Sequence, residues 1–203
     1  QLMGAASAGV PALSVTAGPM IGGRFEDKKL GACSDCRGMW NEFRGGAIDT
    51  ETLDQVQGEL FPSAGHCMVM GTASTMASIT EALGMMLPGL AAIPAPNSKR
   101  LRLAEESGRR IVEMVEEGLT PDKIMTREAF ENAIRVLMAV GGSTNAVVHL
   151  PAIAGRLGIE LPLSLFDELS RTTPHITGVR PSGGNFLMED LAAAGGIAAV
   201  MKE

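Results

Sequence analysis

Apolar runs of strand length alternate with amphipathic helical patterns along this chain, and this alternation constrains its fold most. The run Ala12–Ala17 ends at Gly18-Pro19, so we expect a buried strand that leads into a ligand-binding loop. Residues 76–87 and 101–115 repeat apolar side chains every three or four positions, which is typical of helices with one buried face. The alternation predicts an α/β organisation.

Further helices are predicted from their start and stop signals. Asp49 or Thr50 is expected as the N-cap of a short acidic helix over residues 49–57, and Thr120 and Thr126 as the first residues of two more. Another helix is expected over residues 146–157, closed by Gly158.

Composition excludes several classes of function. The 203 residues are 45% apolar with a net charge of −6, and no basic cluster with interleaved aromatic residues suggests nucleic-acid binding. Pro88, Pro94 and Pro96 interrupt the most apolar region, so no membrane span is expected. Three cysteines in a chain of this length argue against a disulfide framework and favour a reducing compartment such as the cytoplasm.

The two ends indicate part of a longer protein. Gln1 opens the chain without an initiator Met, and Glu203 closes a helix-like run that has no capping residue. We therefore expect residues 1–203 to form part of one domain, truncated at both ends.

Cys67 precedes a glycine and a hydroxyl-rich segment that leads into the helix predicted over residues 76–87. A soft thiolate beside a helix N-terminus suits metal or anion chemistry. A second helix start of this kind is Gly141-Gly-Ser-Thr-Asn145. Its two glycines let an oxyanion approach free backbone N–H groups, although N-capping by Ser143 alone explains the same pattern.

The spacing of the cysteines suggests another metal site. Cys33 and Cys36 form a Cys-x-x-Cys pair in a glycine-rich loop, and with Cys67 they would supply three thiolates to zinc or an iron–sulfur cluster, with His66 as a fourth ligand. Redox activity and plain burial compete with this interpretation. His149 is interpreted as a structural histidine with satisfied hydrogen bonds.

Several longer motifs follow one another along the chain: Gly18-Pro-Met20, Cys67-Met-Val-Met-Gly-Thr-Ala-Ser-Thr-Met-Ala77, Glu81-Ala-Leu-Gly84, Arg127 to Asn132 with Arg135, Val140-Gly-Gly-Ser-Thr-Asn-Ala146, Pro181-Ser-Gly183 and Phe186-Leu-Met-Glu-Asp190. In this order they resemble the dihydroxy-acid dehydratase/phosphogluconate dehydratase family. The likeness covers essentially the whole chain.

The resemblance implies a layered α/β/α domain with a largely parallel sheet, matching the family's N-terminal domain. It also implies an iron–sulfur cluster, [2Fe–2S] in preference to [4Fe–4S], held by three cysteines beside a Mg²⁺ ion. Cys67 matches the third cluster cysteine. The other two cysteines, with the Asp and Lys that bind Mg²⁺, would precede Gln1, and the family's C-terminal domain with its serine base is absent. Cys33 and Cys36 match no cluster ligand, which favours a structural role over a redox or auxiliary one.

The implied chemistry is that of a hydro-lyase, which eliminates water from a 2,3-dihydroxy carboxylate to give a 2-keto-3-deoxy acid. The open iron would act as a Lewis acid on the C3 hydroxyl, while Mg²⁺ would hold the carboxylate and the C2 hydroxyl. No catalytic base is identified in this fragment, and the isolated fragment is expected to be inactive. Contacts with the substrate or with the groups around the cluster are expected at Ser74, Thr75, Ser143, Thr144 and Asn145.

Gly71-Thr-Ala-Ser-Thr-Met76 resembles the sugar-acid branch of arabinonate and xylonate dehydratases, so a pentonate is the expected substrate. One alternative is the dihydroxy-acid dehydratase of branched-chain amino-acid biosynthesis, whose more usual Cys-Gly-Gly-Met-Tyr-Thr-Ala-Asn pattern is missing here. Another is an inactive truncated remnant that serves only in subunit association. The resemblance also predicts a homodimer or homotetramer.

Overall fold

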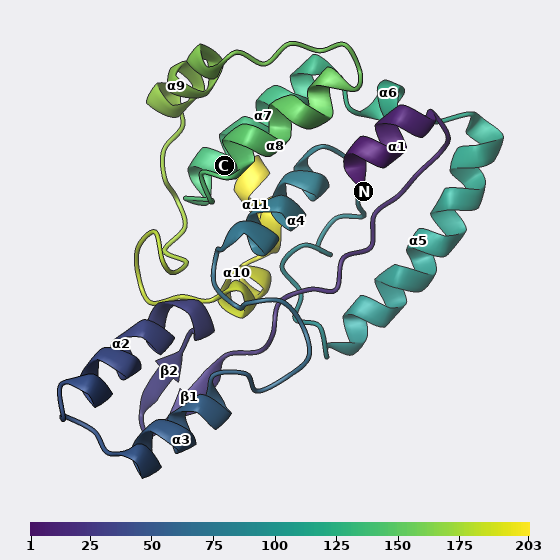
Figure 1. Cartoon of the computed structure of the whole chain (residues 1–203). Coiled ribbons are helices and arrows are strands. Elements are labelled where there is room, and N and C mark those ends of the chain that lie inside the picture. The colour runs from purple at the N-terminus through teal and green to yellow at the C-terminus, as the bar shows by residue number, and fades with distance from the viewer.

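Helices dominate the computed structural model, which describes residues 1–203 (Figure 1). The helices are α1 (Leu2–Ala8), α2 (Ala32–Arg44), α3 (Thr50–Glu59), α4 (Thr72–Ala82), α5 (Ser98–Glu117), α6 (Pro121–Ile124), α7 (Arg127–Ala139), α8 (Ala146–Gly155), α9 (Leu163–Thr172), α10 (Met188–Ala193) and α11 (Gly196–Lys202). The strands are β1 (Gly23–Phe25) and β2 (Lys28–Leu30).

Helices joined to one small sheet are consistent with the expected α/β class, but the expected layered architecture with a largely parallel sheet is wrong. β1 and β2 form one two-stranded antiparallel sheet, in which Gly23 pairs with Leu30. The run Ala12–Ala17 forms no strand, and its Ser14 N–H donates to the carbonyl of Met85, in the turn after α4, at 2.7 Å. A strand needs an extended neighbour. This segment lies against turns and helices instead.

Helix α4 lies at the centre of the main body, where it contacts α7, α8 and α11. The pattern over residues 76–87 predicts a later helix, but α4 begins at Thr72 and ends before Gly84, whose φ of 80° suits a tight turn. Two buried polar residues are satisfied within the helix, because Ser78 Oγ donates to Ser74 O at 2.8 Å and Thr80 Oγ1 to Met76 O at 2.7 Å. The earlier start puts Ser74 and Thr75 in the first turn.

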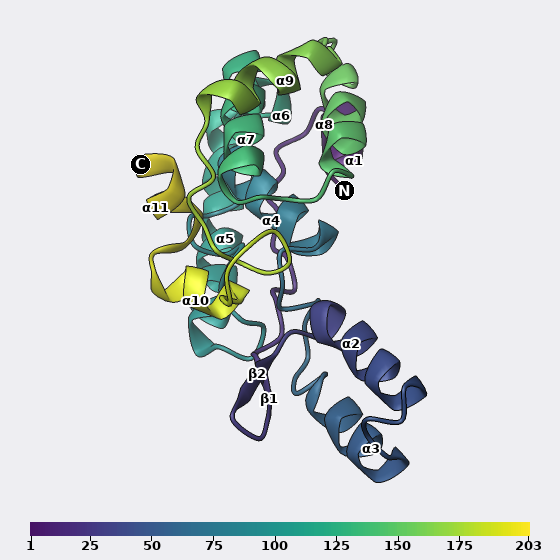
Figure 2. The same ribbon diagram turned by 90° about the vertical axis from the view of Figure 1, so that its left-hand side faces the viewer.

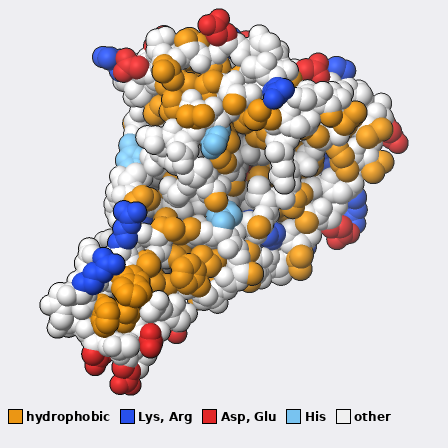
Figure 3. Space-filling view, in the orientation of Figure 1, with side chains coloured by type: hydrophobic (Ala, Val, Ile, Leu, Met, Phe, Trp, Pro, Cys, Tyr) orange, Lys and Arg blue, Asp and Glu red, His pale blue; other side chains and the backbone are white.

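Residues 23–61, here called the arm, project away from the main body in both ribbon views (Figures 1 and 2). The arm holds β1, β2, α2 and α3 and has its own small apolar cluster of Leu30, Val56 and Leu60. The main core is far larger, with 33 buried residues. Figure 3 shows hydrophobic side chains on the surface of the arm, where Phe61 is 62% exposed.

The helix starts expected from capping residues are confirmed. Asp49 Oδ1 accepts from Thr52 N at 2.8 Å, and Thr126 Oγ1 accepts from Ala129 N at 3.4 Å. The expected glycine-rich loop around Cys33 and Cys36 is wrong, because both cysteines lie in α2. None of the helices combines the length and apolar character needed to cross a bilayer.

Candidate active site

The segment that carries Cys67 is held against the loop that follows Ala12–Ala17. His66 N donates to Gly18 O at 2.9 Å, and Met20 N donates to His66 O at 2.8 Å, which makes one parallel bridge. Gly65 has a φ of 129°, and a Cβ atom there would lie 2.7 Å from Met20 N. A residue without a side chain is therefore required for this close approach.

Ser74 ties the Cys67 segment to the first turn of α4. Its Oγ donates to Val69 O at 2.8 Å and lies 3.3 Å from Cys67 O, and the residue is only 1% exposed. The Cys67 thiol itself is half-buried. Ser74 therefore orders the backbone that presents this thiol.

Thr75 points toward a different neighbour, the turn before α8. Its Oγ1 accepts from Ser143 N at 2.9 Å. Thr72 joins the same group, because its Oγ1 lies 3.0 Å from Ser143 Oγ and accepts from Asn145 Nδ2 at 2.8 Å. Three of the expected residues, Thr75, Ser143 and Asn145, thus come together. The sequence analysis missed Thr72, although it lies in the same hydroxyl-rich run.

Thr144 remains outside this hydroxyl cluster, since it is exposed and its side chain makes no hydrogen bond. The preceding glycines are needed for packing. A Cβ at Gly142 would lie 2.8 Å from Thr75 Cγ2, and one at Gly141 would collide with Ser182 Oγ. The Pro181–Gly183 loop therefore packs against the start of the same turn.

His66 has a free basic nitrogen beside Cys67. Its Nδ1 lies 3.2 Å from Cys67 O, a pure acceptor, so this hydrogen bond requires the proton on Nδ1. Nε2 then carries a lone pair and is a hydrogen-bond acceptor, and it is buried without a partner. Burial lowers the pKa of His66 below its usual value, and the positive charge of Arg100 lowers it further. These surroundings therefore favour the neutral form of the ring.

Arg100, at the start of α5, is a buried cation that the sequence analysis missed. The residue is 6% exposed, and its guanidinium donates to Thr16 O and Leu90 O at 2.6 Å each, and also to Ile93 O. Carbonyl groups from two separate loops thus share one charge. The guanidinium also lies under Gly18, where it would collide with a Cβ atom.

Cys33 lies beside Cys67 in space. The neighbouring Cys67 thiol, to which Cys33 can donate a hydrogen bond, raises the pKa of Cys33 to about 11. Cys36 is half-buried and packs against the arm cluster. No three His, Cys, Asp or Glu side chains are arranged to hold a metal ion. The hypothesis of a complete three-cysteine metal site within this chain is therefore wrong.

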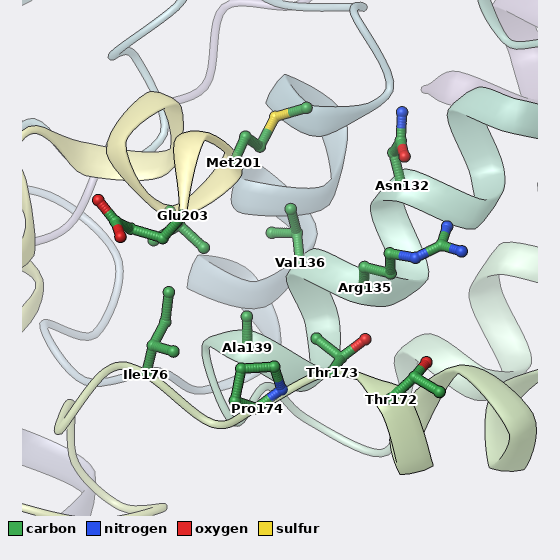
Figure 4. Close-up of a pocket in the computed structure, with 11 residues that line it drawn as sticks. Asn132, Arg135, Val136, Ala139, Thr172, Thr173, Pro174, Ile176, Met201 and Glu203 are labelled. Carbon is green, nitrogen blue, oxygen red and sulfur yellow. The ribbon is translucent and has the colours of Figure 1, made fainter.

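Two of the cavities are lined by residues other than Cys67. One, of about 340 Å³, is lined by residues of α7, of α11 and of the segment that follows α9. Figure 4 shows Asn132 and Arg135 on α7, with Met201 and Glu203 across from them. Another, of about 390 Å³, is lined by Thr16, Thr80 and His149. His149 is exposed and its ring makes no hydrogen bond, so the expectation of a satisfied structural histidine is wrong.

Comparison with known proteins identifies a family. Residues 1–203 match the family described as dihydroxy-acid/6-phosphogluconate dehydratase N-terminal. A dihydroxy-acid dehydratase of Methanococcoides burtonii is 52% identical over 202 residues, and one of Thermodesulfovibrio yellowstonii is 49% identical; each match covers 100% of this chain and 36% of the relative. Dihydroxy-acid dehydratase 1 of Methanosarcina acetivorans is 48% identical over the same shares.

The chain spans about 36% of the length of these curated relatives. A family match over every residue, joined to identities near one half, confirms the resemblance that the Cys67 and Gly141 motifs indicate. The chain belongs to the dihydroxy-acid/6-phosphogluconate dehydratase family, of which it carries the N-terminal region.

Proposed function

We propose that this chain forms the N-terminal part of an iron–sulfur hydro-lyase that removes water from a 2,3-dihydroxy carboxylate. The observation that carries the proposal is the family match over residues 1–203. The names of the relatives favour a dihydroxy-acid dehydratase, which was the alternative of the sequence analysis, over the sugar-acid enzyme that was its main prediction. A run of residues such as Gly71–Met76 separates these branches less well than similarity along the whole chain.

The residues present fit one side of an iron–sulfur centre. Cys67 supplies a half-buried thiol, and the buried His66 Nε2 beside it lacks a partner. The remaining ligands would come from outside these residues, because no three metal-binding side chains converge here. The centre, when bound, supplies a Lewis acid for the departing hydroxyl group. The type of cluster is open to Mössbauer spectroscopy, with [2Fe–2S] as the proposed form.

The chain's own residues would position and shield this centre. Ser74 holds the Cys67 carbonyl and the Val69 carbonyl, so it limits where the thiol can point. Thr75 fixes the Ser143 turn, which presents Ser143 and Asn145 at the neighbouring edge. No three His, Cys, Asp or Glu side chains converge here, and the ligands of Mg²⁺ are proposed to lie in other parts of the full-length protein.

The test is turnover by the full-length protein, purified without oxygen. Keto-acid formation would be measured with 2,3-dihydroxyisovalerate, a panel of pentonates and hexonates, and 6-phosphogluconate. We expect the highest kcat/KM for dihydroxyisovalerate. A higher kcat/KM for a pentonate would instead assign the protein to the sugar-acid branch. Absence of product with every substrate, despite bound iron, would overturn the proposal and favour the inactive remnant.

The assembly is proposed to be a homodimer or homotetramer. Light scattering of the same full-length preparation would measure its molar mass, and a monomer would contradict this part of the proposal.

A further inference from the structure

The start of α2 runs alongside the Cys67 segment in opposite chain directions. A Cβ atom on Gly31 would lie 2.7 Å from Val69 Cγ1, and Ala32 N lies 3.1 Å from Met68 Sδ. The contacts thus pair residue 31 with residue 69 and residue 32 with residue 68. Cys33 is the next residue of α2, and its thiol lies within hydrogen-bond reach of the Cys67 thiol.

The surrounding packing fixes both partners of this pair. Met68 and Val69 are 0% and 1% exposed, and they form one apolar cluster with Ala32, Met20 and Leu187. Cys67 packs against the same cluster. The backbone positions that carry the two thiols are therefore held together by buried contacts on either side.

The two thiols differ in how they meet solvent. Cys33 is exposed, whereas Cys67 is half-buried. Cys36 lies one helical turn beyond Cys33, but it packs into the arm cluster around Leu30 and Val56. Cys33 is therefore the thiol of α2 that is placed to react with Cys67, and Cys36 provides a natural control.

We propose that Cys33 and Cys67, when Cys67 is not bound to iron, form a reversible disulfide by exchange with a low-molecular-weight disulfide. The two thiols are already neighbours in the folded protein, and closeness of the two residues is what a disulfide needs first. Nothing in the dehydratase chemistry requires Cys33, so the pair is an additional modification site.

The reaction balances with a low-molecular-weight disulfide, such as oxidised glutathione, as the oxidant. One protein thiolate attacks that disulfide, forms a mixed disulfide and releases one small thiol. The second protein thiolate then attacks the protein sulfur of the mixed disulfide and releases the other small thiol. The protein loses two protons and two electrons, and one small disulfide becomes two thiols.

The consequence for the metal centre rests on the proposed function, in which Cys67 is an iron ligand. A sulfur atom in a disulfide has no thiolate to offer to iron. The disulfide would therefore keep Cys67 from binding iron until a reductant restores the thiol, and it would protect this sulfur from irreversible oxidation.

The test maps the link in the iron-free, full-length protein after exposure to oxidised glutathione. Trypsin would release Cys33 and Cys36 in residues 30–37 and Cys67 in a separate peptide. We expect a disulfide-linked pair of these peptides in the wild type and in Cys36→Ser, and none in Cys33→Ser. Circular dichroism spectra of the three proteins would verify that each variant is folded.

A link that survives Cys33→Ser, or mixed glutathione disulfides without any link, would overturn the proposal. The effect on iron binding is measured in a separate experiment. The oxidised protein is reconstituted with iron and sulfide before and after reduction. We expect cluster absorbance only after reduction. A mapped Cys33–Cys67 disulfide that leaves cluster uptake unchanged would support the disulfide and would overturn the assignment of Cys67 as a ligand.

Discussion

Thr75 shows how one buried side chain joins the two helix starts of the candidate site. Its hydroxyl oxygen accepts the Ser143 N–H, while its methyl group lies where a Cβ on Gly142 would collide with it. The residue itself is fully buried. The turn before α8 therefore depends on a hydroxyl group and on a missing side chain together.

Replacing Thr75 with Val should destabilise the protein by about 1–3 kcal/mol, because the Ser143 N–H loses its partner while the shape of the side chain is kept. Urea unfolding would measure this change. Thr144→Val is the matched control, since Thr144 is exposed and makes no side-chain hydrogen bond, and it should leave the unfolding midpoint nearly unchanged. Equal effects of the two variants would contradict the role given to Thr75.

Residues of this site could be predicted from the sequence where a short motif marks them. Ser74 and Thr75 are recognisable because a hydroxyl-rich run opens a helix after a cysteine. The proximity of Cys33 to Cys67 depends on how the arm packs, and no short-range pattern reveals it. Arg100 was missed because an arginine at the start of a charged helix normally faces solvent.

At the scale of elements, Arg100 connects α5 to two loops that lie far apart in the sequence. Its guanidinium reaches the carbonyl groups of Thr16, Leu90 and Ile93. A planar group with several fixed donors can serve these acceptors together, whereas an ammonium group is a single point of charge.

Arg100→Lys should therefore lower the free energy of unfolding by about 1.5–3 kcal/mol, because buried carbonyl groups lose charged donors. Arg102→Lys is the control on the same helix, since Arg102 is exposed and its contact with Ser98 is long, at 3.4 Å. Thermal unfolding of both variants would measure the difference. A smaller loss for Arg100→Lys than for Arg102→Lys would refute this account.

Glu81 connects α4 to the loop after it, and its burial gives a pH dependence. Its carboxylate accepts from Gly89 N at 2.8 Å and from Ala91 N at 2.9 Å, but burial dominates and raises the pKa of Glu81 above its usual value. The folded state thus binds this proton more tightly than the unfolded state. Its contribution to stability is complete at pH below the usual value of 4.5 and is lost as pH rises through the raised pKa.

Unfolding free energies of the wild type and of Glu81→Gln, measured at several pH values from 4 upward, would reveal this effect. The stability of the wild type relative to the variant should fall as pH rises and then level off. A relative stability that rises over this window would contradict the shift.

Helices were easier to predict than strands in this chain for a physical reason. Asp49 and Thr126 cap their helices through residues only three positions away, so the signal lies in the sequence itself. Ala12–Ala17 has the composition of a strand, but a sheet also needs an extended partner from elsewhere. That partner is absent, and the parallel sheet expected from the family resemblance is absent with it.

At the scale of the whole molecule, the arm and the main body should differ in local stability. The arm buries the small cluster of Leu30, Val56 and Leu60, whereas α4 and α7 belong to a core of 33 buried residues. Hydrogen exchange monitored by mass spectrometry should therefore show faster exchange in α2 and α3 than in α4 and α7. Uniform protection across the four helices would contradict this difference.

The projecting arm has a consequence for how Cys67 is reached. Cys33 and the start of α2 cover one side of the Cys67 segment, and both belong to the part of the molecule with the smaller core. Each local opening of the arm would uncover Cys67 without unfolding α4. The rate at which a thiol reagent modifies Cys67 should therefore follow how often the arm opens.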